Sequence, residues 1–159
     1  MLWRSTLHLF LFSLQQAFVR MVKKRAYKAK TDAEFLNQVS FIVFVVRFNY
    51  ALVEKKWPQI QKAFYDFDIQ KLSKMDLENL EPFLKAPGMI KNKWKINAVL
   101  QNARTCAKLQ AEHGSILKWI SKAKKEIKKS PVLAPELREL FRTFRGIGPL
   151  TSTWLESIY

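Results

Sequence analysis

Residues 88–104 read GMIKNKWKINAVLQNAR, and this stretch decides the fold that we expect for the chain. Pro87 and Gly88 interrupt the chain just before it, and Asn92 is a favourable N-cap for a helix that extends to about Gln110. One face of that helix is apolar and consists of Ile96, Val99, Leu100, Ala103 and Ala107. Another face is polar and carries Asn97, Gln101, Arg104 and Lys108. The helix has a basic approach at its start, formed by Lys91, Lys93 and Lys95.

The composition favours a single all-α domain. A length of 159 residues is enough to bury one core. Only four glycines and six prolines occur, which favours helices over a turn-rich β fold. Cys106 is the only cysteine, so an internal disulfide is excluded, and its apolar neighbours predict a buried, inert thiol. A reducing, intracellular environment is consistent with this.

The charge of the chain points to a polyanionic partner. Lysine and arginine number 28, aspartate and glutamate number 13, and the formal net charge is +15. Such a surplus is typical of proteins that bind nucleic acid or an acidic membrane surface. Charge favours nucleic acid, while the membrane surface and solubility without a specific partner stay open.

The chain divides into an N-terminal extension, residues 1–30, and a helical domain, residues 31–159. The extension has no acidic residue and combines an apolar stretch with the basic run Lys23-Lys24-Arg25. It is consistent with an amphipathic helix that closes the core, with a membrane-surface helix, or with a short secretory signal. The apolar part is too short to span a bilayer.

Residues 31–56 predict one long helix. Thr31 and Glu34 have the spacing of a capping box. Residues 39–46 are rich in β-branched and aromatic side chains, which locally favours a strand. Because neither glycine nor proline occurs between Thr31 and Trp57, a buried helix is the better interpretation.

Shorter helices are expected after this one. Pro58 suits the first turn of one helix, and Asp68 and Asp76 are N-cap candidates for two more. Ser115 begins a helix, and Pro135 begins the last helix before the closing segment. The outer face of the helix after Ser115 carries a row of lysines at helical spacing, Lys118, Lys122, Lys125 and Lys129. Such a row is usually a solvated face, and in this chain it also offers a surface for phosphates.

The closing segment, Arg145-Gly146-Ile147-Gly148-Pro149, lies between two expected helices, which is the pattern of a helix-hairpin-helix DNA-binding element. Two glycines let the backbone turn tightly and approach a phosphate. The next helix begins with unpaired N–H groups and a partial positive charge. Such contacts position DNA without reading its sequence, whereas a plain helical corner is the alternative, since G-x-G alone is weak. The DNA-binding candidates here are Arg145, Gly146, Ile147, Gly148 and Thr151. Further candidates precede the Asn92 helix: Lys91, Asn92 and Lys93.

Several of these segments resemble one family. The run G-M-I-K-N-K-W-K-I-x-A followed by N-A-R resembles the G-I-I-R-N-x-x-K-I-x-A…N-A-R signature of the 3-methyladenine DNA glycosylase I family. Residues 57–72 are similar to its segment A-F-x-x-F-D-x-x-K-V, and residues 112–115 to its F-G-S. The resemblance implies a single helical domain of the helix-hairpin-helix glycosylase type. It also implies hydrolysis of the N-glycosidic bond of alkylated adenine, after the nucleotide is turned out of the duplex.

The pocket of this family carries E-G-Q-Q-A-G-L-S-W, which aligns with residues 42–50. Tyr50 then takes the place of the base-stacking tryptophan, and any aromatic face can stack. Ile42 takes the place of the glutamate that contacts the base, and its side chain can neither accept a hydrogen bond nor carry charge. Phe48 and Asn49 complete the base-binding candidates. No catalytic residue is assigned, and Glu54, one turn beyond Tyr50, is the candidate for a substitute acid.

Two further departures from the family concern metal and catalysis. The Cys and His residues show no zinc-ligand spacing, so we expect neither the family's zinc nor any other cofactor. Other helix-hairpin-helix glycosylases place an aspartate about twenty residues beyond the hairpin, which this sequence does not reach.

The sequence therefore predicts a DNA repair enzyme that releases alkylated purines from damaged duplex DNA. We expect a monomer without an obligatory protein partner, intracellular and, in a bacterium, cytoplasmic and nucleoid-associated. Membrane association is not expected. The alternatives are a DNA-binding protein that keeps this scaffold without the chemistry, and a membrane-surface protein that acts through its first thirty residues.

Overall fold

The structure, a computed structural model, describes residues 27–131 and 136–159. Helices and the turns between them make up these residues, which confirms the all-α prediction. The helices are α2 (Asp32–Val45), α3 (Tyr50–Ala63), the 3-10 turn η1 (Tyr65–Phe67), α4 (Ile69–Leu72), α5 (Glu81–Leu84), α6 (Lys93–His113), α7 (Ile116–Lys129), α8 (Leu137–Phe141) and α9 (Pro149–Ile158). The expectations for residues 1–26 lie outside the described residues.

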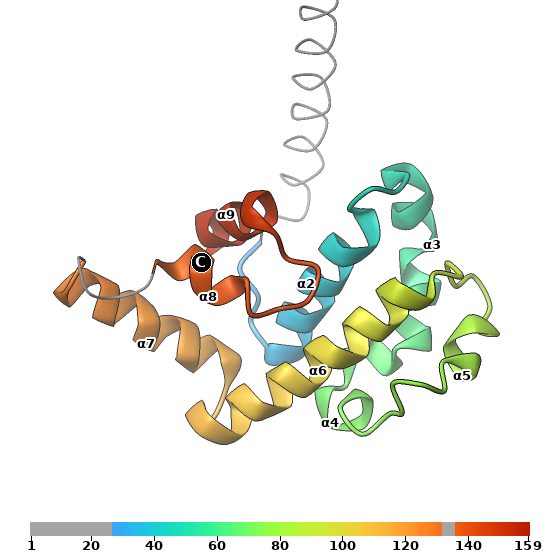
Figure 1. The fold of residues 1–159 in the computed structure, drawn as a ribbon, viewed down its shortest axis with the longest axis horizontal. Helices are drawn as coiled ribbons and strands as arrows, with labels where there is room; N and C mark the ends of the chain where they lie inside the picture. Colours follow the sequence, from blue (N-terminus) through green and yellow to red (C-terminus); the bar gives the residue numbers. More distant parts are fainter. Residues whose placement is uncertain (1–26, 132–135) are drawn as a thin grey trace, which may run out of the picture.

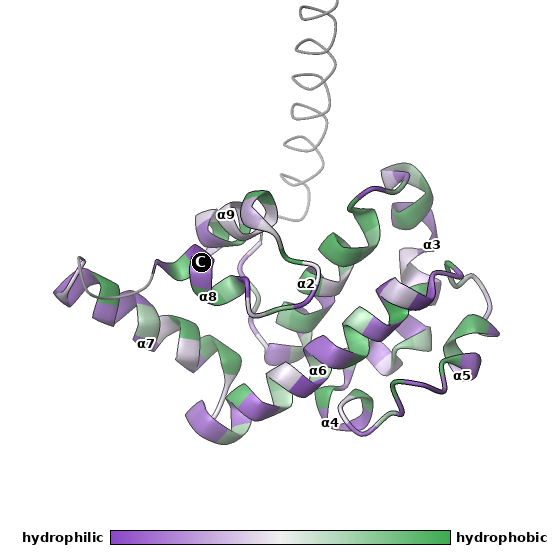
Figure 2. Cartoon of the chain, viewed as in Figure 1, coloured by the Kyte–Doolittle hydropathy of each residue, from purple (hydrophilic) through white to green (hydrophobic). Residues whose placement is uncertain are grey.

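Helix α6 crosses the middle of the molecule, with α3, α4 and α5 on one side and α7, α8 and α9 on the other (Figure 1). Two groups of aromatic side chains fill these sides, and α2 contributes to both. Phe44 packs near Trp57 and Phe64, whereas Phe35 packs near Phe144. A helix placed between two halves of a core is apolar on most of its surface, which is why the end of α2 is so uniformly hydrophobic in Figure 2.

The prediction of a single helix over residues 31–56 is wrong. Helix α2 ends at Val45, Arg47 adopts the left-handed conformation with φ 54°, and α3 begins at Tyr50. The Asn49 side chain caps the new helix by accepting the Leu52 N–H at 3.0 Å. Asparagine is a strong N-cap, and it breaks the helix here without glycine or proline.

Pro58 does not begin a helix, because α3 starts earlier and contains it. The other caps follow the prediction at four places. Backbone N–H groups at the starts of α2, α6, α7 and α4 donate to the side chains of Thr31, Asn92, Ser115 and Asp68. Asp76 accepts the N–H of Glu78 in a turn instead, and α5 begins only at Glu81, so that predicted cap is wrong.

The two ends of the described chain meet beside α2. The hydroxyl of Tyr159 donates to Gln38 Oε1 at 2.6 Å and accepts the Ala29 N–H at 3.3 Å. The Asp32 carboxylate accepts the N–H groups of Ile116 and Leu117, which caps α7 from the start of α2. These bonds fix the α8–α9 side of the molecule onto α2. In the part of the chain that the structure describes, no helix has the length and apolarity that a membrane span needs.

Candidate nucleic-acid interface

The hairpin between α8 and α9 turns at Gly146 and packs against α2 and α6. Gly146 has φ +84°, a conformation that side-chain-bearing residues rarely adopt. A Cβ there would lie 3.0 Å from Val43 Cγ2 and 3.2 Å from Trp94 Cη2. Gly148 has φ −97°, and a Cβ at this position would meet nothing within 4 Å. The fold therefore requires Gly146, whereas Gly148 leaves open space outside the backbone.

Asn102, on α6, holds the hairpin by its backbone. Its Nδ2 donates to the Arg145 carbonyl at 3.0 Å, and its Oδ1 accepts the Arg145 N–H at 2.7 Å. Asn102 is buried, so these bonds satisfy groups that water does not reach. Arg104 donates to the carbonyls of Ser73 and Met75 and holds the segment after α4. The N-A-R motif is thus a structural device that ties two loops to α6.

Lys95 connects α6 to the end of α2. Its Nζ donates to the carbonyl oxygens of Val43 at 2.6 Å and of Val46 at 2.7 Å. These carbonyls end α2, where the helix dipole favours a cation. Burial lowers the pKa of Lys95 to about 8. The expectation that Lys95 belongs to an exposed basic approach is therefore wrong, since its side chain is buried and fixes the turn.

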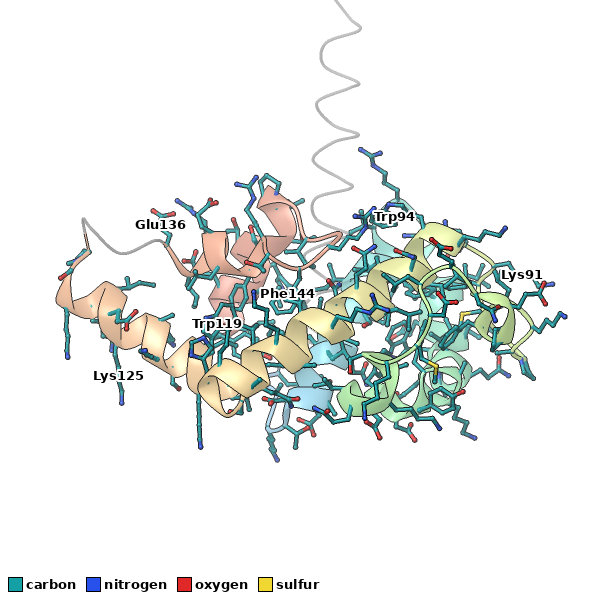
Figure 3. The ribbon with its side chains drawn as sticks, turned by 60° about the horizontal axis from the view of Figure 1, so that its bottom comes forward. Lys91, Trp94, Trp119, Lys125, Glu136 and Phe144 are labelled. Carbon is teal, nitrogen blue, oxygen red and sulfur yellow. The ribbon has the colours of Figure 1, made fainter. Side chains whose placement is uncertain are left out.

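Aromatic side chains surround the outer side of this junction. Trp94, at the start of α6, is 50% exposed, and the guanidinium carbon of Arg145 lies 5.7 Å from its ring centroid. Figure 3 shows Trp94 beside the hairpin. Phe48 is 39% exposed, with Lys95 Nζ 5.9 Å from its ring centroid. Leu150, at the start of α9, is exposed as well. Exposed aromatic rings beside cationic groups suit stacking on nucleic-acid bases.

The DNA-binding candidates before α6 lie at the surface. The side chains of Lys91 and Lys93 are exposed. Asn92 is partly buried, and its side-chain oxygen caps α6 by accepting the Lys95 N–H at 3.1 Å. The side chains of the two lysines are accessible to a partner, and Asn92 orders the start of the helix beside them.

Two side chains among the DNA-binding candidates of the hairpin are buried. Ile147 is packed in the core, and Thr151 is buried. The Thr151 hydroxyl accepts the N–H of Gly148 at 2.9 Å and lies 3.1 Å from the Gly148 carbonyl. The fold uses both side chains internally, and the Thr151 hydroxyl is engaged at the start of its own helix. A phosphate contact through the hairpin backbone stays a prediction. Arg145 is exposed, and phosphate contacts by its side chain and by the first-turn N–H groups of α9 stay a prediction.

The base-binding candidates lie at the turn between α2 and α3. Phe48 and Asn49 are exposed. Tyr50 is half-buried, and its ring stands edge-on to Phe41 with centroids 5.7 Å apart. The Tyr50 hydroxyl donates to Glu54 Oε1 at 3.2 Å. The structure thus brings together the aromatic ring and the carboxylate that the sequence singled out.

Ile42 lies inside the core. It is 2% exposed and belongs to the cluster of buried apolar side chains between α2 and its neighbours. A buried isoleucine offers no polar atom to a base. Position 42 supplies no carboxylate. The carboxylate that accepts the hydrogen bond of Tyr50 belongs to Glu54.

Two cavities among the described residues lie away from this junction. One has a volume of about 550 Å³ and is lined by the start of α2, by α4 and by the corner between α6 and α7. The other, of about 130 Å³, is lined by residues of α7, by His113 and by Leu140. Neither is lined by Tyr50, Ile42 or a residue of the hairpin, so neither is a ready pocket for a base stacked on Tyr50.

Cys106 is buried in α6, and burial raises the pKa of its thiol, as an inert structural cysteine requires. Within residues 27–131 and 136–159, no three His, Cys, Asp or Glu side chains are grouped as a metal site needs. The absence of zinc stays a prediction.

Sequence reasoning did not assign the roles that three residues have at this junction: Trp94, Lys95 and Asn102. The signal for two of them was present. Lys95 and Asn102 lie seven residues apart, on the same face of α6 as buried Val99 and Cys106. Polar residues on a buried face must find hydrogen-bond partners, and both do so on neighbouring segments. Trp94 carried no such signal, because its exposure depends on where the hairpin lies.

Comparison with known proteins identifies the family of the chain. The family model described as methyladenine glycosylase matches residues 23–140. The chain belongs to the methyladenine glycosylase family. No curated protein matches.

Three solved structures of 3-methyladenine DNA glycosylase I share the fold. The chain is 17% identical to the E38Q mutant of 3-methyladenine DNA glycosylase I from Staphylococcus aureus, with TM-score 0.66 over 80% of this chain and 77% of that one. A structure of the same enzyme that concerns 3-methyladenine recognition gives 16% identity and TM-score 0.67 over 84% and 79%. A further structure of 3-methyladenine DNA glycosylase I has 17% sequence identity and TM-score 0.65, over 84% of this chain and 81% of that one.

Proposed function

We propose that this protein binds damaged duplex DNA across the junction of the hairpin, α6 and the α2–α3 turn, and releases an alkylated purine from it. The observation that carries the proposal is the convergence of cationic and aromatic side chains on this junction. Arg145 stands over the half-exposed Trp94, which adjoins Lys93 and lies against the hairpin. Phe48 is exposed at the neighbouring turn.

The proposed division of roles follows from the exposure of each group. Lys91, Lys93 and Arg145 are exposed cations for backbone phosphates, and the first turn of α9 offers N–H groups to another. Phe48 and Tyr50 supply aromatic surface to the nucleotide that leaves the stack. Asn49 holds Tyr50 in place as the cap of α3.

The proposed chemistry depends little on acid–base catalysis. An N3- or N7-alkylated purine is cationic, so its glycosidic bond is already weakened, and turning it into a dry aromatic environment favours its loss. When the N-glycosidic bond breaks, its electron pair stays with the purine, which leaves as a neutral base, and water adds to C1′ of the sugar. Glu54, hydrogen-bonded to Tyr50, is the carboxylate in place to offset the positive charge that develops on the sugar. Ile42 takes no part.

The test is base release from alkylated duplex DNA under single-turnover conditions, measured as free 3-methyladenine and 7-methylguanine. We expect release by the wild type and a loss of roughly tenfold or more in Tyr50→Ala, since stacking contributes ~1–3 kcal/mol per base. Asn37→Ala, which removes the acceptor of the Trp57 N–H at 2.9 Å without touching Tyr50 or Glu54, serves as the control for general destabilisation. No release by folded wild type overturns the catalytic proposal.

A second candidate is a protein that recognises damaged DNA without releasing the base. Burial of Ile42 at the aligned glutamate position favours it, because the pocket then lacks that polar contact. The same samples decide between the two. Tighter binding to alkylated than to undamaged duplex, without base release, selects this candidate.

A further inference from the structure

Helix α7 carries the densest positive charge of the described helices. Six of its 14 residues are lysines, and Glu126 is its one acidic residue. Its inner face holds Ile116, Ile120 and Ala123, which are buried. Its outer face carries the lysine row, which is exposed and consists of Lys118, Lys122, Lys125 and Lys129.

The charges of the row are mostly unneutralised within the described chain. Lys122 lies 4.0 Å from Glu126, which is an exposed and weak pair. The structure shows no ion pair between Lys118, Lys125 or Lys129 and any described carboxylate. Like charges at i, i+3 and i, i+4 spacing destabilise a helix. The row is thus an electrostatic cost to the free protein that an anionic partner would relieve.

The row lies on a different side of the molecule from the hairpin. In Figure 3, Lys125 points away from the body on the side opposite to Glu136, whereas Trp94 lies beside the hairpin at the far end of α6. A duplex bound at the hairpin junction, as proposed above, would therefore lie on another side of the molecule than the one that the row faces.

We propose that the α7 lysine row is a second surface for duplex DNA, which binds backbone phosphates of a segment other than the one held by the hairpin. The row spans about 16 Å, at about 1.5 Å per helical residue. Duplex DNA carries one charge per ~1.7 Å of its axis, so a row of this length faces several phosphates at once. One chain then joins two duplex segments.

Duplex DNA fits this surface better than a membrane does. A helix that binds a bilayer surface inserts an apolar face between the lipids. The apolar face of α7 packs on the protein core, and its outer face offers ammonium groups. Purely electrostatic contacts of this kind are what the phosphate backbone uses, and they carry no sequence preference.

The experiment compares two variants of the full chain with equal net charge. The row variant replaces Lys118, Lys122, Lys125 and Lys129 by Gln, which has a similar helix propensity. The control variant replaces four exposed lysines outside α7 by Gln, namely Lys62, Lys74, Lys85 and Lys108. Binding of short undamaged duplexes is measured at several salt concentrations, together with the number of duplexes bound per chain.

We expect two duplexes per wild-type chain and per control variant, but one per row variant. In the wild type and the control variant, log affinity for the second duplex should fall with log salt with a slope of about 3 to 4, about one unit per lysine–phosphate contact, and the row variant should lack this second binding step. One duplex per wild-type chain overturns the proposal, and so does equal binding by the two variants. Retained DNA stoichiometry with loss of binding to phosphatidylserine vesicles assigns the row to membranes instead. Base release measures the hairpin side, so its absence leaves this test intact.

Discussion

The fold uses the hairpin and position 42 of α2 in different ways, although the two are close: the residue of α2 that the hairpin contacts is Val43, next to Ile42. Gly146 of the hairpin packs against Val43, and Asn102 holds the backbone of Arg145 on both sides. Ile42, the next residue on α2, contributes only apolar volume. The hairpin must keep its residue types because its backbone geometry depends on them. A pocket side chain can change its chemistry while the scaffold stays the same, which is why the family fold by itself does not settle the reaction.

The largest loss of stability is expected for Asn102→Leu, which tests whether the hairpin depends on its residue types. The change leaves the N–H and carbonyl of Arg145 without their buried partner, at about 1–3 kcal/mol for each group. We expect a loss of about 3 kcal/mol in the free energy of unfolding, measured by denaturant titration.

Gln101→Leu is the matched control for Asn102→Leu, because the Gln101 side chain donates only to Asn97 on the same helix. A similar loss in both variants would mean that the hairpin is not held by Asn102.

The two glycines of the hairpin give the next prediction, because a substitution at Gly146 should mainly lower stability and one at Gly148 should mainly weaken DNA binding. Gly146→Ala forces a side chain into the left-handed region and against Val43, so we expect about 2 kcal/mol of destabilisation. Gly148→Leu points into open space and should cost only about 0.5 kcal/mol, as a weaker cap of α9.

Once the loss of stability is accounted for, DNA affinity should fall more in Gly148→Leu than in Gly146→Ala. Gly148→Leu places its side chain where a phosphate would approach α9, so it should weaken binding to all duplexes alike. Unchanged affinity of this folded variant in a fluorescence-anisotropy titration removes the hairpin from the proposed interface.

The third prediction concerns Lys95, the group that joins the two regions. Burial lowers its pKa to about 8 from the ordinary lysine value of 10.5, so between these pH values the unfolded chain holds a proton that the folded chain has released. Stability therefore rises with pH across this window, and the cost of burying the charge is fully present below it. Lys95→Met should remove this component. The measurement is the denaturation midpoint of both proteins from pH 7.5 to 10.5, and parallel curves would exclude Lys95 as its source.

Much of the scaffold could be predicted from the sequence, because its signals are local. Asn92, Ser115 and Asp68 cap helices as their residue types indicate. The G-I-G segment turns between two helices as expected. The break before Tyr50 was missed, because the apolar run before Asn49 is equally compatible with a continuing helix.

The site was harder to predict because its contacts are long-range. Lys95 reaches carbonyls of residues about fifty positions away in sequence, and Asn102 reaches Arg145. The helical period places each residue on a face of α6 but does not say which loop that face meets. Thr151 has the residue type of a phosphate donor, yet its hydroxyl closes onto its own helix start. Only the folded arrangement distinguishes these uses.

The smallest effect is expected at Trp94, where the hairpin and the proposed interface meet. Trp94→Leu removes the ring beneath Arg145, and an exposed cation–π contact contributes about 0.5–1 kcal/mol. Stability should change by no more than that, while duplex affinity falls by roughly tenfold, because both the stacking surface and the placement of Arg145 are lost. Trp94→Phe keeps an aromatic ring and should recover most of the affinity. If Leu and Phe bind duplex DNA equally well, Trp94 only fills space beside Gly146, and the interface is confined to the cationic groups.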